Sequence, residues 1–375
     1  MRILYFTKDY TPHDHRFLSA LAETEHEVFS LRLEKRGVER ESRPLPAGVN
    51  PVRWAGGCRP VDREEYPALV RDLATVLEAV RPDVVHAGSV QTAALLTAMA
   101  GFHPLVTMSW GYDLLMDADS SSRMLADTRF TLETSDAFVC DCQAVAEKAK
   151  EFGFPSERIT ILPWGVDLGH FSPEQKDQFI RQQLGWDNDE IVVLSTRAWE
   201  PVYDVGTVVQ GFIEAAAQNS RLRLILLGGG SQAQALQEMI TEAGVADKVW
   251  LGGRTQYADL PGYYQAADVY VSASLTDGSS LSLMESLACA TPAIVSDIPG
   301  NREWVVEGEN GWFFPVGDWQ ALSAKLQEIA AVDPLRWKQM GRNARDAAEK
   351  RANWPENFKK LVTAYNIAME GSKDA

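Results

Sequence analysis

The stretch VYVSASLTDGSSLSLMESLACATPAIVS, residues 269–296, holds a short apolar run, a loop of small polar residues, a helical pattern and a second short apolar run. The two apolar runs, Val269–Ala273 and Ala293–Ser296, have the length and composition of buried strands. Between them, the apolar residues of 281–288 repeat at helical spacing. Strand, loop, helix and strand in this order predict part of a doubly wound parallel α/β sheet.

The loop in this stretch carries two carboxylates, Asp277 and Glu285, with seven residues between them. Ser279 or Ser280 is the expected N-cap of the helix. Such a loop points backbone N–H groups and the positive end of a helix dipole at one spot, which suits a phosphate. Asp277 would lie before the helix and Glu285 one to two turns inside it. The pattern therefore favours a ligand held by backbone at its diphosphate and by carboxylates at its hydroxyls.

An alternative needs no ligand. Ser282 and Glu285 also fit a Ser-x-x-Glu capping box, which satisfies the first N–H groups of a helix. Asp277 and Gly278 form an ordinary turn pair. From this stretch alone, both interpretations stay open.

The same rhythm runs along the whole chain. Short apolar runs alternate with amphipathic helical patterns, such as the long one at Tyr66–Val80, as in a doubly wound sheet. The loop after the first strand is expected to extend to Arg16, with a helix at Phe17–Glu23 after it. A helical segment is expected from Pro334 to Met369. The expected strands are Ile3–Thr7, Glu27–Leu33, Pro82–Ala87, Leu105–Ser109, Ala137–Cys142, Ile159–Leu162, Ile191–Thr196, Leu222–Leu227, Lys248–Leu251, Val269–Ala273 and Ala293–Ser296.

The rhythm breaks at Pro163–Asp189, which is rich in proline, glycine and charge. We therefore predict two Rossmann-like domains in tandem, residues 1–165 and 188–350, joined by a linker at 166–187. A C-terminal helix at about 351–370 is expected to pack back on the first domain. Ligands of such sheets bind beyond the carboxyl ends of the strands, so residues that directly follow strands are site candidates.

Composition limits the function. The chain has 375 residues, 45% of them hydrophobic, and a net charge of -16, which argues against a nucleic-acid binder. The four cysteines show neither zinc spacing nor a disulfide framework, and no His, Asp and Glu set has metal-ligand spacing. Neither a signal peptide nor a membrane-spanning run is found. We expect a cytoplasmic protein, with the inner face of a membrane as a second option.

In the second half, three further loops follow strands. Arg197 could bind a diphosphate, or form a surface ion pair with Glu200. Gly228–Gly230 lacks the third spaced glycine of a dinucleotide fingerprint and favours a close turn between strand and helix. Arg254, after Gly252 and Gly253, could bring a second cation near the phosphates or merely end a strand.

In the first half, Trp110 and Asp113 follow a strand. Aromatic faces pack on sugar C–H surfaces and a carboxylate accepts hydroxyl hydrogen bonds, so the pair suits a sugar. The alternative is a buried tryptophan, with Asp113 capping the next helix. His13 and His15, expected in the loop after the first strand, are candidates on the acceptor side.

Taken together, these motifs make the chain similar to the retaining, nucleotide-sugar-dependent glycosyltransferases of the GT-B fold, family 4. The resemblance covers nearly the whole chain and is densest in its second half. Asp277 and Glu285 stand where the family has two glutamates separated by seven residues. The motifs that resemble the family are Ser-Thr-Arg197, Leu227–Gly230, Asp277 through Glu285, Ala288–Ile294, Asp297–Arg302, Gly308–Phe314 and Pro163–Asp167.

The resemblance implies two Rossmann-like domains facing across a cleft. It also implies transfer of a sugar from a nucleoside diphosphate sugar to an acceptor hydroxyl, with retained configuration and without a metal or other cofactor. Glu285 would bind the ribose and Asp277 the donor sugar. Arg197 and the amides of Gly278, Ser279, Ser280 and Leu281 would hold the diphosphate, with Arg254 nearby.

Three departures from the family pattern stand out. Asp277 is one methylene shorter than the usual glutamate. The lysine expected a few residues after Arg197 is missing from residues 201–205, which read Pro-Val-Tyr-Asp-Val. The first-domain loop lacks the frequent Gly-Gly, and Trp110 stands where a histidine is common. The phosphate charge would then rest more on Arg197 and Arg254.

Other functions remain to be separated. A sugar-nucleotide epimerase or hydrolase would use the same donor site without an acceptor. An NAD-dependent dehydrogenase predicts a full Gly-x-Gly-x-x-Gly after an early strand, and a sugar-binding protein without chemistry would fit a secretion signal. Neither feature is found. The expected acceptor is a glycan or lipid-linked molecule of the cell envelope. Between Arg32 and Arg63, basic residues outnumber acidic ones. This charge pattern indicates a solvated loop, and weak contact with an anionic membrane is the alternative.

Overall fold

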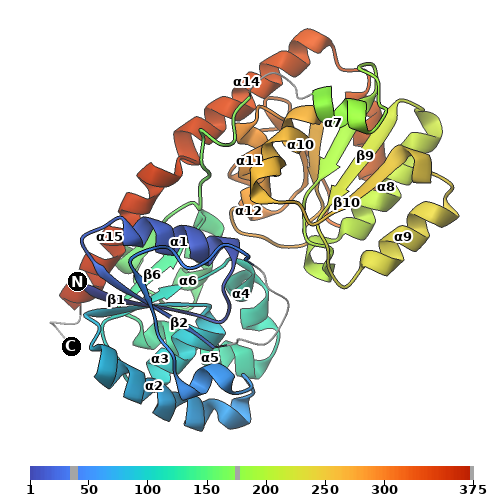
Figure 1. Cartoon of the computed structure of the whole chain (residues 1–375). Helices are drawn as coiled ribbons and strands as arrows, with labels where there is room; N and C mark the ends of the chain where they lie inside the picture. Colours follow the sequence, from blue (N-terminus) through green and yellow to red (C-terminus); the bar gives the residue numbers. More distant parts are fainter. Residues whose placement is uncertain (34–40, 174–177, 372–375) are drawn as a thin grey trace. The chain divides into compact units, whose positions relative to one another are not determined.

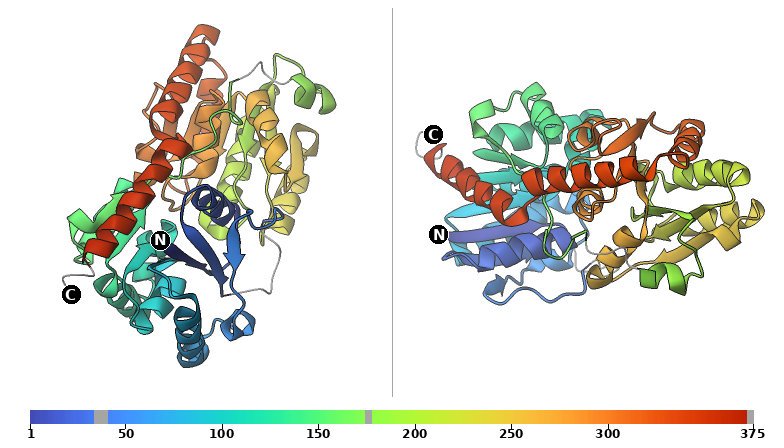
Figure 2. Two further views of the ribbon diagram at one scale, coloured as in Figure 1. Left: turned by 60° about the vertical axis from the view of Figure 1, so that its left-hand side comes forward. Right: turned by 90° about the horizontal axis from the view of Figure 1, so that it is seen from above.

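The computed structural model describes residues 1–33, 41–173 and 178–371. Within these ranges the chain divides into two compact units. Unit 1 is Met1–Leu162 together with the residues from Phe358 onward, and unit 2 is Pro163–Asn357. Figure 1 shows an α/β sheet in each unit with helices over both of its faces, and Figure 2 shows the same layers from two further sides.

Unit 1 is built on a seven-stranded parallel sheet with the order β3-β2-β1-β4-β5-β6-β7. Strands β1 and β4 lie at its centre, where Ile3 pairs in register with Val84. The strand bounds are β1 Arg2–Thr7, β2 Glu27–Arg32, β3 Val49–Pro51, β4 Val84–Gly88, β5 Leu105–Met108, β6 Ala137–Cys140 and β7 Ile159–Ile161.

Unit 2 is built on a six-stranded parallel sheet with the order β10-β9-β8-β11-β12-β13. The order places β8, β11 and β12 side by side, so the loops that follow them are neighbours. The strand bounds are β8 Ile191–Ser195, β9 Leu222–Leu227, β10 Val249–Gly253, β11 Val269–Ser272, β12 Ala293–Ser296 and β13 Gly311–Phe314. Two parallel Rossmann-like halves confirm the predicted fold class.

Helices connect the strands in both units. In unit 1 they are α1 Pro12–Ala22, α2 Tyr66–Val80, α3 Leu95–Met99, α4 Tyr112–Leu115, α5 Ser122–Thr134 and α6 Gln143–Glu151. In unit 2 they are α7 Gln178–Gln183, α8 Val205–Gln218, α9 Ala233–Glu242, α10 Leu260–Ala266, α11 Leu281–Ala288, α12 Pro299–Arg302, α13 Trp319–Ile329 and α14 Pro334–Arg351. Helix α15, Trp354–Gly371, runs from the end of unit 2 into unit 1.

Each unit buries its own core between sheet and helices. In unit 1, Leu4 and Val85 of the central strands pack with Leu73 of α2, all fully buried. In unit 2, Val193 and Val271 of β8 and β11 pack with Phe212 of α8. Because both faces of these parallel strands are covered, they are apolar along their length rather than alternating.

The predicted loop through Arg16 is wrong, because α1 begins at Pro12. Thr11 is its N-cap and forms a reciprocal capping box with Asp14, and proline at the first helical position adds to the signal. His13 and His15 therefore lie on a helix and not in a loop.

The predicted C-terminal helical segment is two helices, α14 and α15. Residues Ala352 and Asn353 separate them, and Asn353 forms an isolated bridge with Val166. Pro355 explains the break, because its ring has no N–H to continue the helix and clashes with the preceding turn. Within α15, Tyr365 donates to or accepts from His86 Nδ1 of β4 at 2.9 Å, which ties the helix to unit 1.

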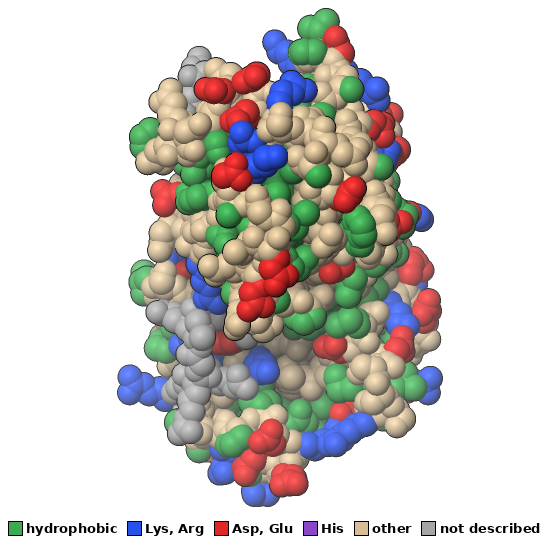
Figure 3. Space-filling model, turned by 90° about the vertical axis from the view of Figure 1, so that its right-hand side faces the viewer, with side chains coloured by type: hydrophobic (Ala, Val, Ile, Leu, Met, Phe, Trp, Pro, Cys, Tyr) green, Lys and Arg blue, Asp and Glu red, His purple; other side chains and the backbone are tan. Residues whose placement is uncertain are grey.

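The charge on one face and the apolar length of the helices bear on contact with other molecules or a membrane. On the face drawn in Figure 3, acidic and basic side chains are intermixed over its described residues. A search of the described helices for a segment both long and apolar enough to cross a membrane finds none.

Candidate active site

The loop at residues 273–280, which the sequence predicts to bind phosphate and which we call the phosphate loop, lies at the carboxyl end of β11 and leads into α11. Ser280 is the N-cap, and its Oγ accepts a hydrogen bond from Leu283 N at 3.4 Å. Ser282 lies inside the helix, and Glu285 is five residues past the cap. The capping-box alternative for Ser282 and Glu285 is therefore wrong, and both side chains are left for other contacts.

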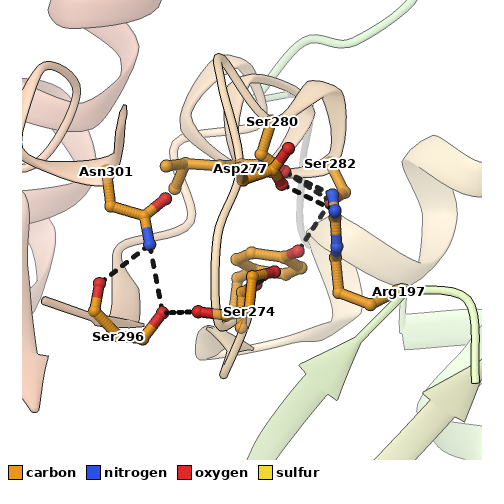
Figure 4. Close-up of polar contacts among 10 residues, drawn as sticks. Arg197, Ser274, Asp277, Ser280, Ser282, Ser296 and Asn301 are labelled. Atoms are coloured by element: carbon orange, nitrogen blue, oxygen red, sulfur yellow. Dashed lines mark hydrogen bonds and ion pairs between the residues drawn. The ribbon is translucent and has the colours of Figure 1, made fainter. Parts of the chain in front are cut away.

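Arg197 reaches this loop from the neighbouring strand, β8. Its Nη2 donates to Asp277 Oδ2 at 2.6 Å, and its Nη1 donates to Ser280 Oγ at 2.6 Å and to Ser282 Oγ at 3.1 Å (Figure 4). The exposed fractions of the Arg197 and Asp277 side chains are only 10% and 16%. Two residues eighty positions apart are thus brought together as a largely buried ion pair. The alternative of a surface pair between Arg197 and Glu200 is wrong: Glu200 accepts hydrogen bonds from Ser231 instead.

Tyr203 covers one face of the same guanidinium. The Arg197 Cζ lies 4.0 Å from the centre of the Tyr203 ring, a cation–π contact. The segment that carries Tyr203 is fixed to the phosphate loop, because Leu275 N donates to Val202 O at 2.9 Å. Tyr203 lies in the segment 201–205, where the family lysine is missing.

Glu285 is held on the buried side of α11. Its Oε2 accepts a hydrogen bond from the Tyr264 hydroxyl at 2.8 Å, and that hydroxyl also contacts Thr196 Oγ1 at 2.9 Å. Tyr264 is fully buried, and burial, with the Glu285 charge next, raises the pKa of its phenol well above the usual range. Tyr264 therefore acts as a donor that orients the Glu285 carboxylate.

The loop after β12 supports the Asp277–Gly278 turn from behind. A Cβ on Gly300 would lie 2.3 Å from Gly278 O and 2.6 Å from Asp277 O, so only glycine fits there. Asn301 Nδ2 donates to Ser296 O at 2.8 Å, and Ser296 Oγ donates to Ser274 O at 2.6 Å (Figure 4). These contacts link the loops after β11 and β12, which lie at the same end of the sheet.

The triglycine loop after β9 allows the Arg197 loop to pack closely. A Cβ on Gly228 would lie 2.6 Å from Arg197 O, and one on Gly230 would lie 2.4 Å from Trp199 O. This fits the predicted close turn. Arg254 is exposed, and its side chain lies over Gly229, 3.5 Å from where a Cβ would stand. The structure thus places Arg254 beside the triglycine loop.

Charge at the site is balanced within the protein. Burial raises the pKa of the Asp277 carboxyl, and the Arg197 guanidinium offsets part of that effect. Burial lowers the pKa of Arg197, but Asp277 and the surrounding tyrosines more than compensate, so its pKa lies above the usual value. Arg197 is therefore a fixed cation at the start of α11, where the helix dipole also favours an anion.

In unit 1, Asp113 is 1% exposed and its carboxylate accepts three hydrogen bonds. The donors are Ser109 Oγ at 2.6 Å, Trp110 N at 3.0 Å and Val90 N at 3.1 Å. Burial raises the pKa of Asp113 to about 6. The alternative in which Asp113 caps the next helix is wrong, because Asp113 lies inside α4, whose N-cap Gly111 has no side-chain cap. The Asp113 carboxylate instead fixes the loop that carries Trp110.

The acceptor-side candidates lie near that loop. The His13 and Trp110 rings are 5.3 Å apart, and Phe17 lies edge-on to Trp110 at 6.5 Å. His15 lies beside Tyr10, with ring centres 6.2 Å apart. Burial, followed by the Arg43 charge, lowers the pKa of His15. Part of the basic segment between Arg32 and Arg63, namely 34–40, lies outside the described residues, as do positions 174–177 of the predicted linker.

The sequence pattern does not mark Tyr203 or Tyr264 as site residues, and it indicates Ser282 only as a possible helix cap. The missing lysine at 201–205 was a signal for Tyr203, whereas nothing in the local pattern marks Tyr264. A search of the described residues finds no group of three or more His, Cys, Asp or Glu side chains that could hold a metal ion.

Family comparisons agree with this architecture. The model described as Glycosyltransferase Family 4 matches residues 13–170, and the model described as Glycosyl transferases group 1 matches residues 176–347. The N-terminal part of the chain therefore belongs to Glycosyltransferase Family 4 and the C-terminal part to Glycosyl transferases group 1, on the fold of the GT-B glycosyltransferases. The resemblance inferred from the motifs is confirmed.

Two relatives are both named D-inositol 3-phosphate glycosyltransferase. The one from Thermobispora bispora is 29% identical over 90% of this chain and 88% of its own length. The one from Gordonia bronchialis is 25% identical over 68% of this chain, and the match spans only 57% of that relative's length. A similar solved structure is Anabaena Alr3699/HepE in complex with UDP and glucose. It has 20% identity, a TM-score of 0.80, and coverage of 98% of this chain and 99% of that one, and it supports the fold.

Proposed function

We propose that this chain is a retaining glycosyltransferase that moves a sugar from a nucleoside diphosphate sugar to an acceptor hydroxyl. One observation carries the proposal: a largely buried arginine, Arg197, lies against the N-terminus of α11 at the carboxyl ends of adjacent parallel strands. That position is where open α/β sheets bind ligands, and an arginine beside helix N–H groups suits a diphosphate.

The donor would be held in two parts. Arg197 and the backbone N–H groups of Gly278–Leu281 would contact the diphosphate, with Arg254 as a weaker second cation. Glu285, oriented by Tyr264, would accept hydrogen bonds from the ribose hydroxyls. Anabaena Alr3699/HepE has also been solved with UDP-glucose, which supports a donor of this class and makes UDP the first nucleotide to try.

The same groups would promote the chemistry. As the bond between sugar and diphosphate breaks, negative charge grows on the leaving phosphate. A fixed guanidinium and oriented N–H groups stabilise that charge more in the transition state than in the ground state. We therefore propose transfer without a metal, which activity in the presence of EDTA would support. Retention of configuration is inferred from the family resemblance, and NMR of the product's anomeric proton tests it.

Calorimetric titration of UDP, GDP and ADP, with NAD as a further ligand, tests the donor site. We expect one nucleoside diphosphate to bind, and Glu285→Ala to weaken it about tenfold, because a hydrogen bond to a charged group is lost. Glu242→Ala, an exposed carboxylate at the end of α9, is the control and should bind like wild type. Binding of NAD alone, or an unchanged affinity in Glu285→Ala, would reject the assignment.

Transfer must also be separated from hydrolysis and epimerisation. A transferase releases nucleoside diphosphate from the donor much faster when an acceptor is present. We propose a glycan or lipid-linked acceptor of the cell envelope, and the names of the two relatives add D-inositol 3-phosphate to the set to be tested. Release that is independent of every acceptor would favour a hydrolase. Action at the cytoplasmic face of a membrane stays a prediction from the sequence.

A further inference from the structure

Arg197 is restrained on three sides by different groups. Ser280 Oγ and Ser282 Oγ accept from Nη1, the Tyr203 ring covers one face, and Asp277 accepts from Nη2. Ser280 is the N-cap of α11 and Ser282 lies in its first turn, where the Tyr270 hydroxyl fixes it further at 2.7 Å. The guanidinium therefore keeps its place through the serines and Tyr203 even when the Asp277 side is free.

Arg197 also has hydrogen-bonding capacity that the protein does not use. Its Nε is buried and has no hydrogen-bond partner among the described residues. A guanidinium offers five N–H donors in a planar fork, and it binds carboxylate and phosphate oxygens with the same geometry. A buried N–H without an acceptor costs free energy, so this donor points to a ligand that supplies one.

We propose that Asp277 is an internal competitor of the donor diphosphate for Arg197, so that nucleotide binding replaces a carboxylate oxygen by a phosphate oxygen at Nη2. The inference rests on the proposed donor site and assigns a role to the residue that departs from the family glutamate. Asp277 is then a positioning residue that acts through Arg197, and not a ligand of the transferred sugar.

Charge supports an exchange over simultaneous binding. A carboxylate left beside Arg197 would lie within a few ångströms of the phosphates, and two anions at that distance repel strongly in a partly buried site. The Asp277 carboxylate stabilises the nucleotide-free protein, because it neutralises the buried Arg197 guanidinium, which would otherwise lack a counter-ion. It also lowers the affinity for the free nucleoside diphosphate, which favours product release.

The two roles for Asp277 predict opposite signs. If Asp277 held the donor sugar, its neutral variant would bind the nucleotide sugar less well and would leave the affinity for a sugar-free diphosphate little changed. If Asp277 competes for Arg197, its neutral variant binds every diphosphate more tightly. Inorganic pyrophosphate and UDP, which carry no sugar, therefore separate the two roles.

The experiment is calorimetric titration of pyrophosphate and UDP into wild type, Asp277→Asn and Asp277→Ser. Two neutral variants are used so that the result does not depend on one of them folding. We expect both to bind pyrophosphate about tenfold more tightly than wild type, because a competing charged hydrogen bond is removed. The gain should disappear when Arg197→Ala is added.

Asp268→Asn is the matched control. Asp268 forms a second inward-facing pair of this unit, with Arg181 Nη2 at 2.7 Å, but it precedes β11 and so lies at the opposite end of the sheet. This variant should lose stability without any gain in pyrophosphate affinity. Equal or weaker pyrophosphate binding by both Asp277 variants would overturn the competition. A gain for pyrophosphate with no binding of UDP, GDP or ADP would support the exchange and reject the proposed function alone.

Discussion

At the level of single residues, the sequence predicts the groups of the proposed donor site but not their contacts with one another. Asp277, Glu285 and Arg197 were predicted from turn chemistry, helical spacing and position after a strand. Their pairing depends on the order of strands in the sheet, which places β8 beside β11. Local pattern does not encode that order, so the 2.6 Å contact between Arg197 and Asp277 was not predictable.

Asp113 gives a test of how burial acts on one carboxyl group. Its pKa is raised from 3.8 to about 6 in the folded chain. The folded state therefore binds this proton more strongly than the unfolded state between these values, so the contribution of Asp113 to folding becomes more favourable as the pH falls from 6 to 4. Asp113→Asn removes this contribution because the amide does not titrate.

Urea unfolding of wild type and Asp113→Asn at pH 6, 5 and 4 measures the effect. We expect the difference between their unfolding free energies to move by about 1.4 kcal/mol per pH unit, in favour of wild type as the pH falls. Parallel pH profiles for the two proteins would show that Asp113 has an ordinary pKa.

At the scale of elements, apolar runs and helical spacing predicted most central strands and the whole of α2. The short edge strands β3 and β13 were missed, because three or four residues give no clear alternation and Gly311 belongs to a turn-like motif. Helix α1 begins earlier than its apolar pattern predicts, because Thr11, Pro12 and Asp14 form the start of the helix with a capping box. Short elements and their ends thus depend on contacts that periodicity does not report.

The close approach of α12 to the phosphate loop makes Gly300→Ala informative. A Cβ there would collide with the carbonyl oxygens of Asp277 and Gly278, so the turn that precedes α11 must move. We expect a loss of about 1–3 kcal/mol in the free energy of unfolding and at least about tenfold weaker binding of the nucleoside diphosphate.

Calorimetry and urea unfolding check both effects. Gly206→Ala in α8 is the control, because its Cβ would meet only Asp204 Oδ1 at 3.8 Å, and it should bind like wild type. Unchanged affinity in Gly300→Ala would show that the Asp277–Gly278 turn does not set the geometry of the binding site.

At the scale of the whole molecule, the sequence rhythm predicted two Rossmann-like halves, and the family models confirm the class. The identity of the acceptor does not follow from the fold. A fold of this kind supports many reactions, and specificity lies in a few side chains on loops. In unit 1 the candidates His13 and Trp110 lie together, but aromatic rings alone do not distinguish a glycan from a lipid headgroup.

A crystal structure of the chain with the nucleoside diphosphate that binds most tightly tests the proposed donor site directly. We expect the diphosphate against Arg197 and the N–H groups that begin α11, the ribose hydroxyls on Glu285, and Asp277 turned away from Arg197 Nη2. A nucleotide bound elsewhere, for example along the triglycine loop with the Arg197–Asp277 pair intact, would contradict it.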